Sequence, residues 1–165
     1  MNVAKLGKHK ILMFRLLEDA ADDSAAKLAL QTNHSWSYTR STESTATKDG
    51  AIVSQGGLEA TLNIEAVASD DPVNNMLKEA VIESKKLEVW EIDIGAEQVE
   101  GKYPATYAQG NLENWEVPNE VEGLVTLSTT MRIDGAPKDG MATITAEQAE
   151  EISYAFRDVT PVPAP

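Results

Sequence analysis

Strict alternation of apolar and polar residues over positions 57–67 is the feature that most constrains how this chain folds. Side chains along a strand point alternately to opposite faces, so the segment predicts a strand with one dry face and one wet face. The apolar set is Leu58, Ala60, Leu62, Ile64 and Ala66. The polar set is Glu59, Thr61, Asn63 and Glu65. Such a strand requires a sheet that is covered on one side and wet on the other.

Further strands are predicted along the chain. Residues 10–17 form an apolar run typical of a strand buried on both faces, and residues 28–38 and 121–133 alternate. The pattern slips within residues 86–94, which indicates either a bulge or burial on both faces. Residues 102–116 predict a strand with a bend or a bulge around Gly110.

A polar segment joins two of these strands. Residues 39–47 are rich in Ser and Thr, and Lys48, Asp49 and Gly50 form a turn in which glycine supplies a positive φ. We expect a long hairpin over residues 28–67, whose tip at about residues 40–56 is a polar loop outside the core.

One helix is clearly predicted after the hairpin. Asp71 is a candidate N-cap and Pro72 suits the first helical position. An apolar stripe follows at helical spacing: Val73, Met76, Leu77, Ala80 and Val81. Residues 145–148 have the spacing of a capping box and predict a shorter helix, and residues 153–158 extend it or form a strand.

These elements predict a mainly β (β + α) fold, either two packed antiparallel sheets or a partly open β-barrel, with one flanking α-helix. We expect residues 1–159 to form a single domain and the Pro-rich residues 160–165 to be a flexible tail.

Composition argues against several classes of function. The 165-residue chain has 27 acidic and 14 basic residues, a net charge of -13, which disfavours binding to nucleic acid or anionic membranes. It has no cysteine, so disulfides and thiolate metal sites are excluded. The apolar N-terminal run is interrupted by Arg15, so we expect a soluble, unprocessed protein. His9 and His34 belong to no recognisable catalytic set, and the Asp clusters lack the spacing of a calcium loop.

An ordered series of segments adds a family resemblance. The segments are VAKLGKHKILMFRLLEDA, LALQTNHSWSYTRSTESTATKDGAIVSQGGLEATL, EVWEIDI, EGKYPATYAQG and TITAEQAEEISYAFRD. Together they resemble the major tail tube protein of long, non-contractile-tailed bacteriophages, over residues 3 to about 160. The resemblance implies hexameric rings that stack into a tube, the conduit for DNA. It implies a structural virion protein, not an enzyme, with no cofactor.

The same resemblance implies partners and a location. The partners are other copies of the chain, the tape measure protein and tail-end proteins, with DNA only in transit and no membrane. The location is the phage tail of the virion, after assembly in the host cytoplasm.

Two sets of residues are assigned on this basis. We expect the wet face of residues 57–67 to line the channel (Glu59, Thr61, Asn63, Glu65), with Gln31 and Asn33 from residues 28–38 as a second candidate. An ordinary outer surface is the alternative. We expect a loop that reaches the next ring: Arg40, Ser41, Thr42, Glu43, Ser44, Thr45, Thr47, Lys48, Asp49 and Gly50. A plain mobile loop is the alternative there.

Two other function classes stay open. One is a soluble β-sandwich binding or adhesion module for a carbohydrate or protein ligand, which would use the aromatic residues Trp36, Tyr38, Trp90, Tyr107 and Trp115. The other is a metal-dependent hydrolase that would use the acidic clusters.

Overall fold

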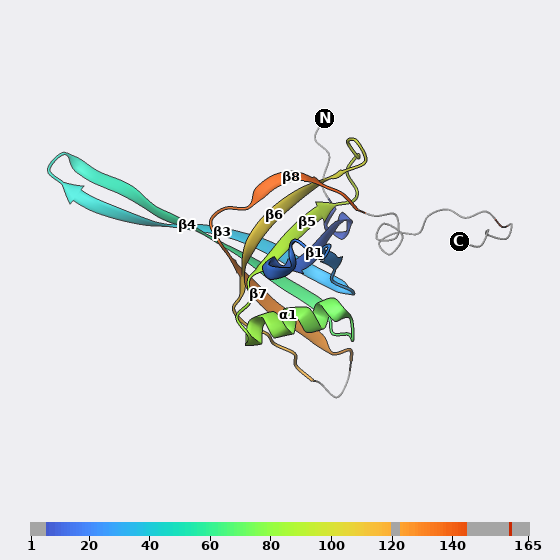
Figure 1. Ribbon diagram of the computed structural model, residues 1–165. Helices are drawn as coiled ribbons and strands as arrows, with labels where there is room; N and C mark the ends of the chain where they lie inside the picture. The colour runs from blue at the N-terminus through green and yellow to red at the C-terminus, as the bar shows by residue number, and fades with distance from the viewer. Residues whose placement is uncertain (1–5, 120–122, 145–158, 160–165) are drawn as a thin grey trace.

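A computed structural model describes residues 6–119, 123–144 and 159, with only the backbone of Lys8 (Figure 1). The strands are β1 (Lys10–Leu16), β2 (Ala26–Lys27), β3 (Gln31–Thr47), β4 (Gly50–Val67), β5 (Leu87–Asp93), β6 (Tyr103–Leu112), β7 (Thr126–Ile133) and β8 (Lys138–Ala142). The helices are α1 (Pro72–Ile82) and two short 3-10 turns, η1 (Gly7–His9) and η2 (Leu17–Asp19).

All of these strands belong to one antiparallel sheet. Its order is β2-β1-β5-β6-β7-β4-β3, and β8 pairs with the first half of β6. The sheet curls until β3 approaches β1. These two strands are joined there by hydrogen bonds from the side-chain amide of Gln31, not by backbone pairing. Gln31 Nε2 donates to the carbonyl of Leu12 at 2.8 Å, and the amide of Leu12 donates to Gln31 Oε1 at 2.9 Å. The predicted mainly β fold with one flanking helix is confirmed, and it takes the form of one curled, open sheet.

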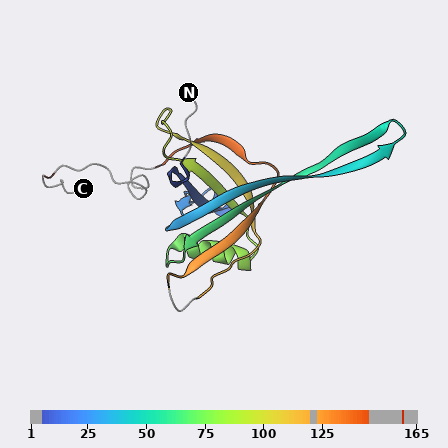
Figure 2. The same ribbon diagram turned by 180° about the vertical axis from the view of Figure 1, so that it is seen from behind.

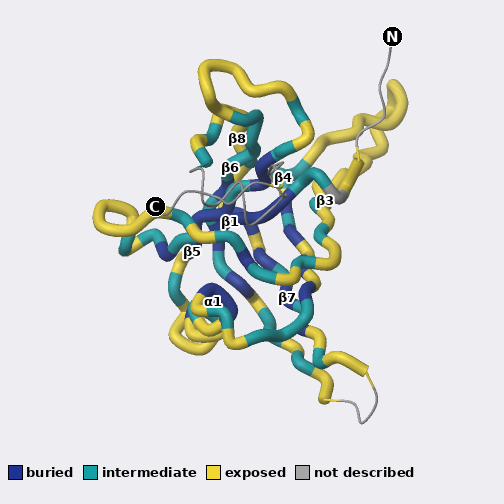
Figure 3. Tube along the Cα trace, turned by 90° about the vertical axis from the view of Figure 1, so that its right-hand side faces the viewer, coloured by how far each residue is buried: buried dark blue, intermediate teal, exposed yellow. Residues whose placement is uncertain are grey.

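The inner side of the curled sheet and α1 enclose the main core. The inward residues of β4 pack there with those of β7, represented by Leu62, Ile64, Leu127 and Met131, and with Leu77 of α1. Figure 3 shows the buried residues gathered in the body of the sheet and along the inner side of α1. The predicted alternation of β4 and the apolar stripe of the helix are therefore both confirmed.

The start of α1 differs from the prediction in one respect. Pro72 occupies the first turn as expected, and Asp71 stands at the N-cap position without a side-chain capping bond. The Asp71 carboxylate instead accepts the backbone amide of Ala29 at 3.1 Å. The capping role predicted for Asp71 is therefore wrong, because the carboxylate is used to hold the connection between β2 and β3.

Strand β5 is buried on both faces. Leu87 and Val89 enter the main core, whereas Ile92 packs on the opposite face with Ile11 and Met13. Its pairing with β1 runs without a register shift. Two-sided burial, not a bulge, therefore explains the slipped pattern.

Strands β3 and β4 form a ribbon that leaves the body of the molecule (Figures 1 and 2). Their pairing continues to Thr47 and Gly50, where the turn has Gly50 at φ 119° as predicted. Residues 39–47 are thus strand, whereas the sequence suggested a loop. A register shift between Arg40 and Thr42 marks where the ribbon leaves the sheet, and residues 42–55 are exposed throughout. These residues are called the arm below.

Two further differences concern the second half of the chain. Residues 138–142 form β8, a strand that was not among those predicted from the sequence. The helix predicted at residues 145–148, the segment 153–158 and the tail 160–165 lie outside the described residues. Within the described part of the chain, no helix has the length and apolar character needed to cross a membrane.

Candidate functional site

A continuous polar face covers β3, β4 and β7 on the side of the sheet away from α1, the side seen in Figure 2. The outward residues of β4 from Glu59 to Glu65 each lie opposite a polar residue of β3, and Thr61, Asn63 and Glu65 also lie opposite polar residues of β7. From β4 the face takes Glu59, Thr61, Asn63 and Glu65, from β3 Asn33, Ser35, Ser37 and Thr39, and from β7 Ser128, Thr130 and Arg132. This set is called the polar face.

Hydroxyl and amide groups dominate the polar face. Thr130 Oγ1 donates to Asn63 Oδ1 at 2.9 Å, and Asn33 Nδ2 lies 3.5 Å from Glu65 Oε2. Within the set, Glu59 and Glu65 are acidic and Arg132 is basic, and Arg132 is itself paired with Glu113 at 3.2 Å. The face thus carries little charge, and its charge is acidic, like that of the whole chain.

The structure brings together five of the six residues predicted to line a channel. Glu59, Thr61, Asn63 and Glu65 share the polar face with Asn33. Gln31 does not lie on the polar face, because a register shift between Gln31 and Asn33 breaks the alternation. Its side chain instead bonds to the backbone of Leu12, where β3 approaches β1.

The residues predicted to reach a neighbouring ring lie on the arm or at its base. At the base, Arg40 Nη1 donates to the carbonyl of Gly56 at 3.1 Å. Near the turn, the amide of Asp49 donates to Thr47 Oγ1 at 3.2 Å. Ile52 and Val53 are apolar yet 61% and 65% exposed, and they point to opposite sides of the ribbon. The arm therefore presents one exposed large apolar side chain on each face.

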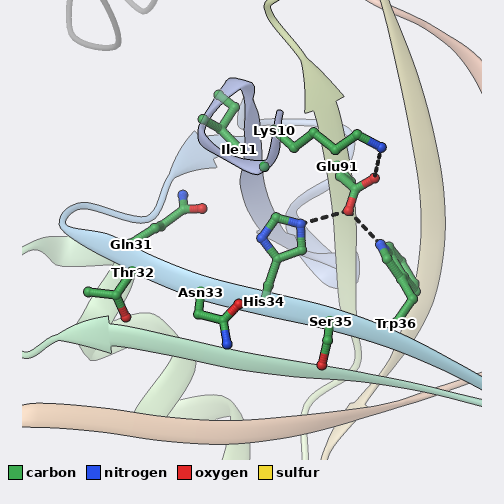
Figure 4. Close-up of a pocket in the computed structure, with 10 residues that line it drawn as sticks. Lys10, Ile11, Gln31, Thr32, Asn33, His34, Ser35, Trp36 and Glu91 are labelled. Carbon is green, nitrogen blue, oxygen red and sulfur yellow. Dashed lines mark hydrogen bonds and ion pairs between the residues drawn. The ribbon is translucent and has the colours of Figure 1, made fainter. Parts of the chain in front are cut away.

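A groove of about 470 Å³ lies where β1 and β3 approach each other (Figure 4). At its inner end the carboxylate of Glu91, on β5, is only 9% exposed. Its Oε2 lies 2.6 Å from His34 Nε2 and 2.6 Å from Trp36 Nε1, and its Oε1 lies 3.4 Å from Lys10 Nζ. Three donors from two strands thus converge on one buried carboxylate.

The surroundings of Glu91 favour its charged form. Burial by itself raises the pKa of the carboxyl, but the hydrogen bonds from His34 and Trp36 and the nearby positive charges outweigh it and lower the pKa to about 2. An ionised carboxylate only accepts hydrogen bonds, so His34 Nε2 must carry the proton. His34, which belongs to no recognisable catalytic set in the sequence, is therefore a hydrogen-bond donor to Glu91.

A second buried glutamate lies on the opposite face of β5. Glu88 Oε2 is 2.6 Å from Arg15 Nε, and the hydroxyl of Tyr107 donates to Glu88 Oε1 at 2.5 Å. Burial and this hydrogen bond raise the pKa of Tyr107. Sequence reasoning assigned no role to Glu88 or Glu91. The available signal was that both interrupt the otherwise apolar residues 87–92.

The aromatic side chains make contacts within the chain. Trp36 stacks on Tyr38 at a centroid distance of 6.3 Å, and Trp90 packs against Tyr107 at 5.1 Å. The guanidinium of Arg15 lies 5.1 Å from the centre of the Trp90 ring. Among the described residues, no group of three or more His, Cys, Asp or Glu side chains is placed to hold a metal ion.

Comparison with known proteins matches this sequence to one family. A family model described as phage tail tube protein matches residues 4–139. Comparison with curated protein sequences gives no match.

Several solved tube structures share the fold. The SPP1 tail tube superposes with a TM-score of 0.77 at 18% identity, over 98% of this chain and 95% of that chain. The tail of an empty GTA particle gives 0.64 at 13% identity, over 82% and 98%. The sheath-tube complex of an extracellular contractile injection system gives 0.55 at 9% identity, over 87% and 95%. At these identities the likeness establishes the fold. Because the family model covers most of the sequence, the chain belongs to the phage tail tube protein family, whose role is structural.

Proposed function

We propose that copies of this chain form hexameric rings, that the rings stack into the tube of a long, non-contractile phage tail, and that the tube conducts DNA during ejection. Family membership and the tube fold support the structural role. The GTA tail was computed with C6 symmetry, which supports six subunits in a ring. The observation that carries the proposal is the polar face, because it gives the sheet a wet side with little charge.

The chemistry of the polar face suits a channel for DNA. Duplex DNA carries one negative charge per ~1.7 Å of its axis, so a basic lining would bind it. Here hydroxyls and amides surround Glu59 and Glu65, and Arg132 is neutralised by Glu113. We infer that this face lines the lumen and lets DNA slide past without holding it.

The free edges of the sheet support closure into a ring. Within the described structure β3 pairs only with β4, although it runs from Gln31 to Thr47, and β8 pairs only with β6. A long open edge presents unpaired backbone groups and favours pairing with another chain. Edge-to-edge contacts between subunits would satisfy these groups and continue the polar face around the channel.

The arm supports stacking of the rings. A two-stranded ribbon by itself is marginally stable in water, so an exposed arm gains most by packing on another surface. Ile52 and Val53 offer it one apolar contact on each side. We infer that the arm reaches a neighbouring ring of the same protein.

The proposed role fixes the remaining partners and the location. Besides copies of itself, the subunit would contact the tape measure protein and tail-end proteins, with DNA only in transit and no membrane. It would be assembled in the host cytoplasm and end in the phage tail of the virion, and it would have no catalytic activity.

Cryo-electron microscopy of assembled protein tests the lumen assignment directly. The chain has no cysteine, so Asn63→Cys and Lys78→Cys each create one labelling site, the first on the polar face and the second on the exposed side of α1. Gold clusters on Asn63→Cys should appear inside the tube, and those on Lys78→Cys should not. Gold on Asn63→Cys outside the wall would show that the polar face is outer surface. A failure to form tubes under any condition would count against the tube proposal itself.

A further inference from the structure

Strand β3 ends the sheet, so β4 is the strand that holds it by backbone pairing along its length. Strand β3 also continues into the arm. The inward side chains of β3, however, reach across the interior to β5. Figure 4 shows His34 and Trp36 turned toward Glu91.

We propose that Glu91 is a positioning residue for the arm: its buried carboxylate fixes β3 against β5 and so sets the direction in which the ribbon leaves the body. The inference rests on the proposed function only for what the arm contacts. The anchoring itself is a property of the single subunit.

The geometry makes this carboxylate an effective anchor. Both bonds from β3 converge on Glu91 Oε2 at 2.6 Å, from His34 and from Trp36. Charge-assisted hydrogen bonds of this kind are shorter and stronger than neutral ones. The side chains of His34 and Glu91 are 11% and 10% exposed, so water competes little for these contacts.

The place of the anchor along β3 connects it to the arm. Trp36 precedes the register shift at Arg40 and Thr42 by one short stretch of strand. That stretch includes Tyr38, which stacks on Trp36 with an interplanar angle of 4°. Movement of β3 at Trp36 would therefore be passed along the ribbon to the arm, which has no third strand to oppose it.

Glu88 provides a matched control on the same strand. It is also buried, at 5% exposure, and also accepts two side-chain bonds, but its partners Arg15 and Tyr107 lie on β1 and β6. Removing its charge disturbs the sheet without touching β3.

The test is a distance measurement between spin labels on the arm and the body of the unassembled subunit. Labels at Thr42→Cys, where the arm begins, and Lys78→Cys, on the exposed side of α1, are specific in a cysteine-free chain. We expect Glu91→Gln to broaden and shift the distance distribution, and Trp36→Phe, which removes one donor and keeps an aromatic ring, to broaden it less. Glu88→Gln should leave the distribution unchanged.

Two results would overturn the proposal. One is an unchanged distribution in both Glu91→Gln and Trp36→Phe. The other is equal broadening in Glu88→Gln, which would reduce the effect to general loss of stability. If Glu91→Gln does not fold, the distance distributions of Trp36→Phe and Glu88→Gln are compared instead. Broadening in Trp36→Phe alone supports the proposal, and its absence overturns it. Tube formation is scored separately, so a subunit that never polymerises would contradict the proposed function and leave this measurement intact.

Discussion

The ionised carboxylate of Glu91 stabilises the folded protein. Its pKa falls from 4.5 to about 2 in the folded protein because the contacts with His34, Trp36 and Lys10 exceed the cost of burial. A group with a lowered folded pKa stabilises the protein fully above its unfolded pKa, and this contribution is lost as the pH falls toward the folded pKa. The shift corresponds to about 3 kcal/mol at neutral pH.

Glu91→Gln should therefore lower the free energy of unfolding by about 3 kcal/mol at pH 7, measured by urea denaturation. The difference from the natural chain should shrink between pH 4.5 and pH 2, where the natural carboxyl becomes protonated and resembles the amide. An equal loss of stability at every pH would mean that shape, not charge, is what Glu91 contributes.

Gly110 allows a close approach between β6 and β7. A Cβ at this position would lie 2.9 Å from the carbonyl carbon of Arg132 and closer still to its oxygen, and these are backbone atoms that cannot rotate away. Gly110→Ala should push β6 from β7 and destabilise the fold by about 3 kcal/mol in thermal or urea unfolding. Gly57→Ala, in β4 with open space around it, should change stability by less than about 0.5 kcal/mol. Similar effects of both substitutions would contradict the steric explanation.

At the scale of elements, the arm should be dispensable for folding and required for assembly. Residues 43–54 are all exposed, so replacing them with an Asn-Gly turn should change the unfolding free energy by less than about 1 kcal/mol. The shortened subunit should remain folded and form no tubes in electron microscopy. The control is Lys48→Asn with Asp49→Gly, which introduces the same turn at full length and should assemble normally. Tubes of the shortened subunit would show that the arm is not an inter-ring contact.

Local pattern was sufficient for most elements. The alternation around Leu62 gives β4 and its buried side, and the spacing of Val73 and Leu77 gives α1. The arm strands were missed because Ser and Thr residues with no core to face leave no hydrophobic period, so only their cross-strand pairing defines them. Strand β8 was missed for a related reason, since it lies at an edge and includes Gly140.

The site was predictable to the extent that it follows from alternation. The wet side of β4 could be identified, and its alignment with Ser35 and Thr130 depends on register, which a single sequence does not specify. The displacement of Gln31 depends on a register shift, and the pairing of Glu91 with His34 depends on the curl of the whole sheet. Contacts between residues this far apart in sequence have no local signal.

At the scale of the whole molecule, the same alternating strands can form either one curled sheet or two packed sheets. What distinguishes them is the contact between the first and last parts of the sheet, where Gln31 bonds to Leu12. This contact comes from a single side chain, so strand patterns alone left both architectures open. The free edge of β3 is the part of the sheet that the proposed pairing between subunits would use.

The net charge of -13 should govern how readily subunits associate. Like-charged subunits repel over the Debye length, which falls from about 30 Å at 0.01 M salt to about 8 Å at 0.15 M. The polar face contributes little to this charge, so the repulsion comes mainly from the rest of the molecule. Tube formation, followed by light scattering at fixed protein concentration, should therefore become faster as salt is raised over this range.

A charge variant separates repulsion from other effects of salt. Asp22→Asn with Asp23→Asn removes two charges from an exposed loop, and it should lower the salt concentration at which tubes appear. If assembly depended mainly on ion pairs between subunits, salt would instead slow it and dissolve existing tubes. That outcome would contradict a repulsion-limited assembly, and it would place the decisive contacts in charged groups rather than in strand edges and the arm.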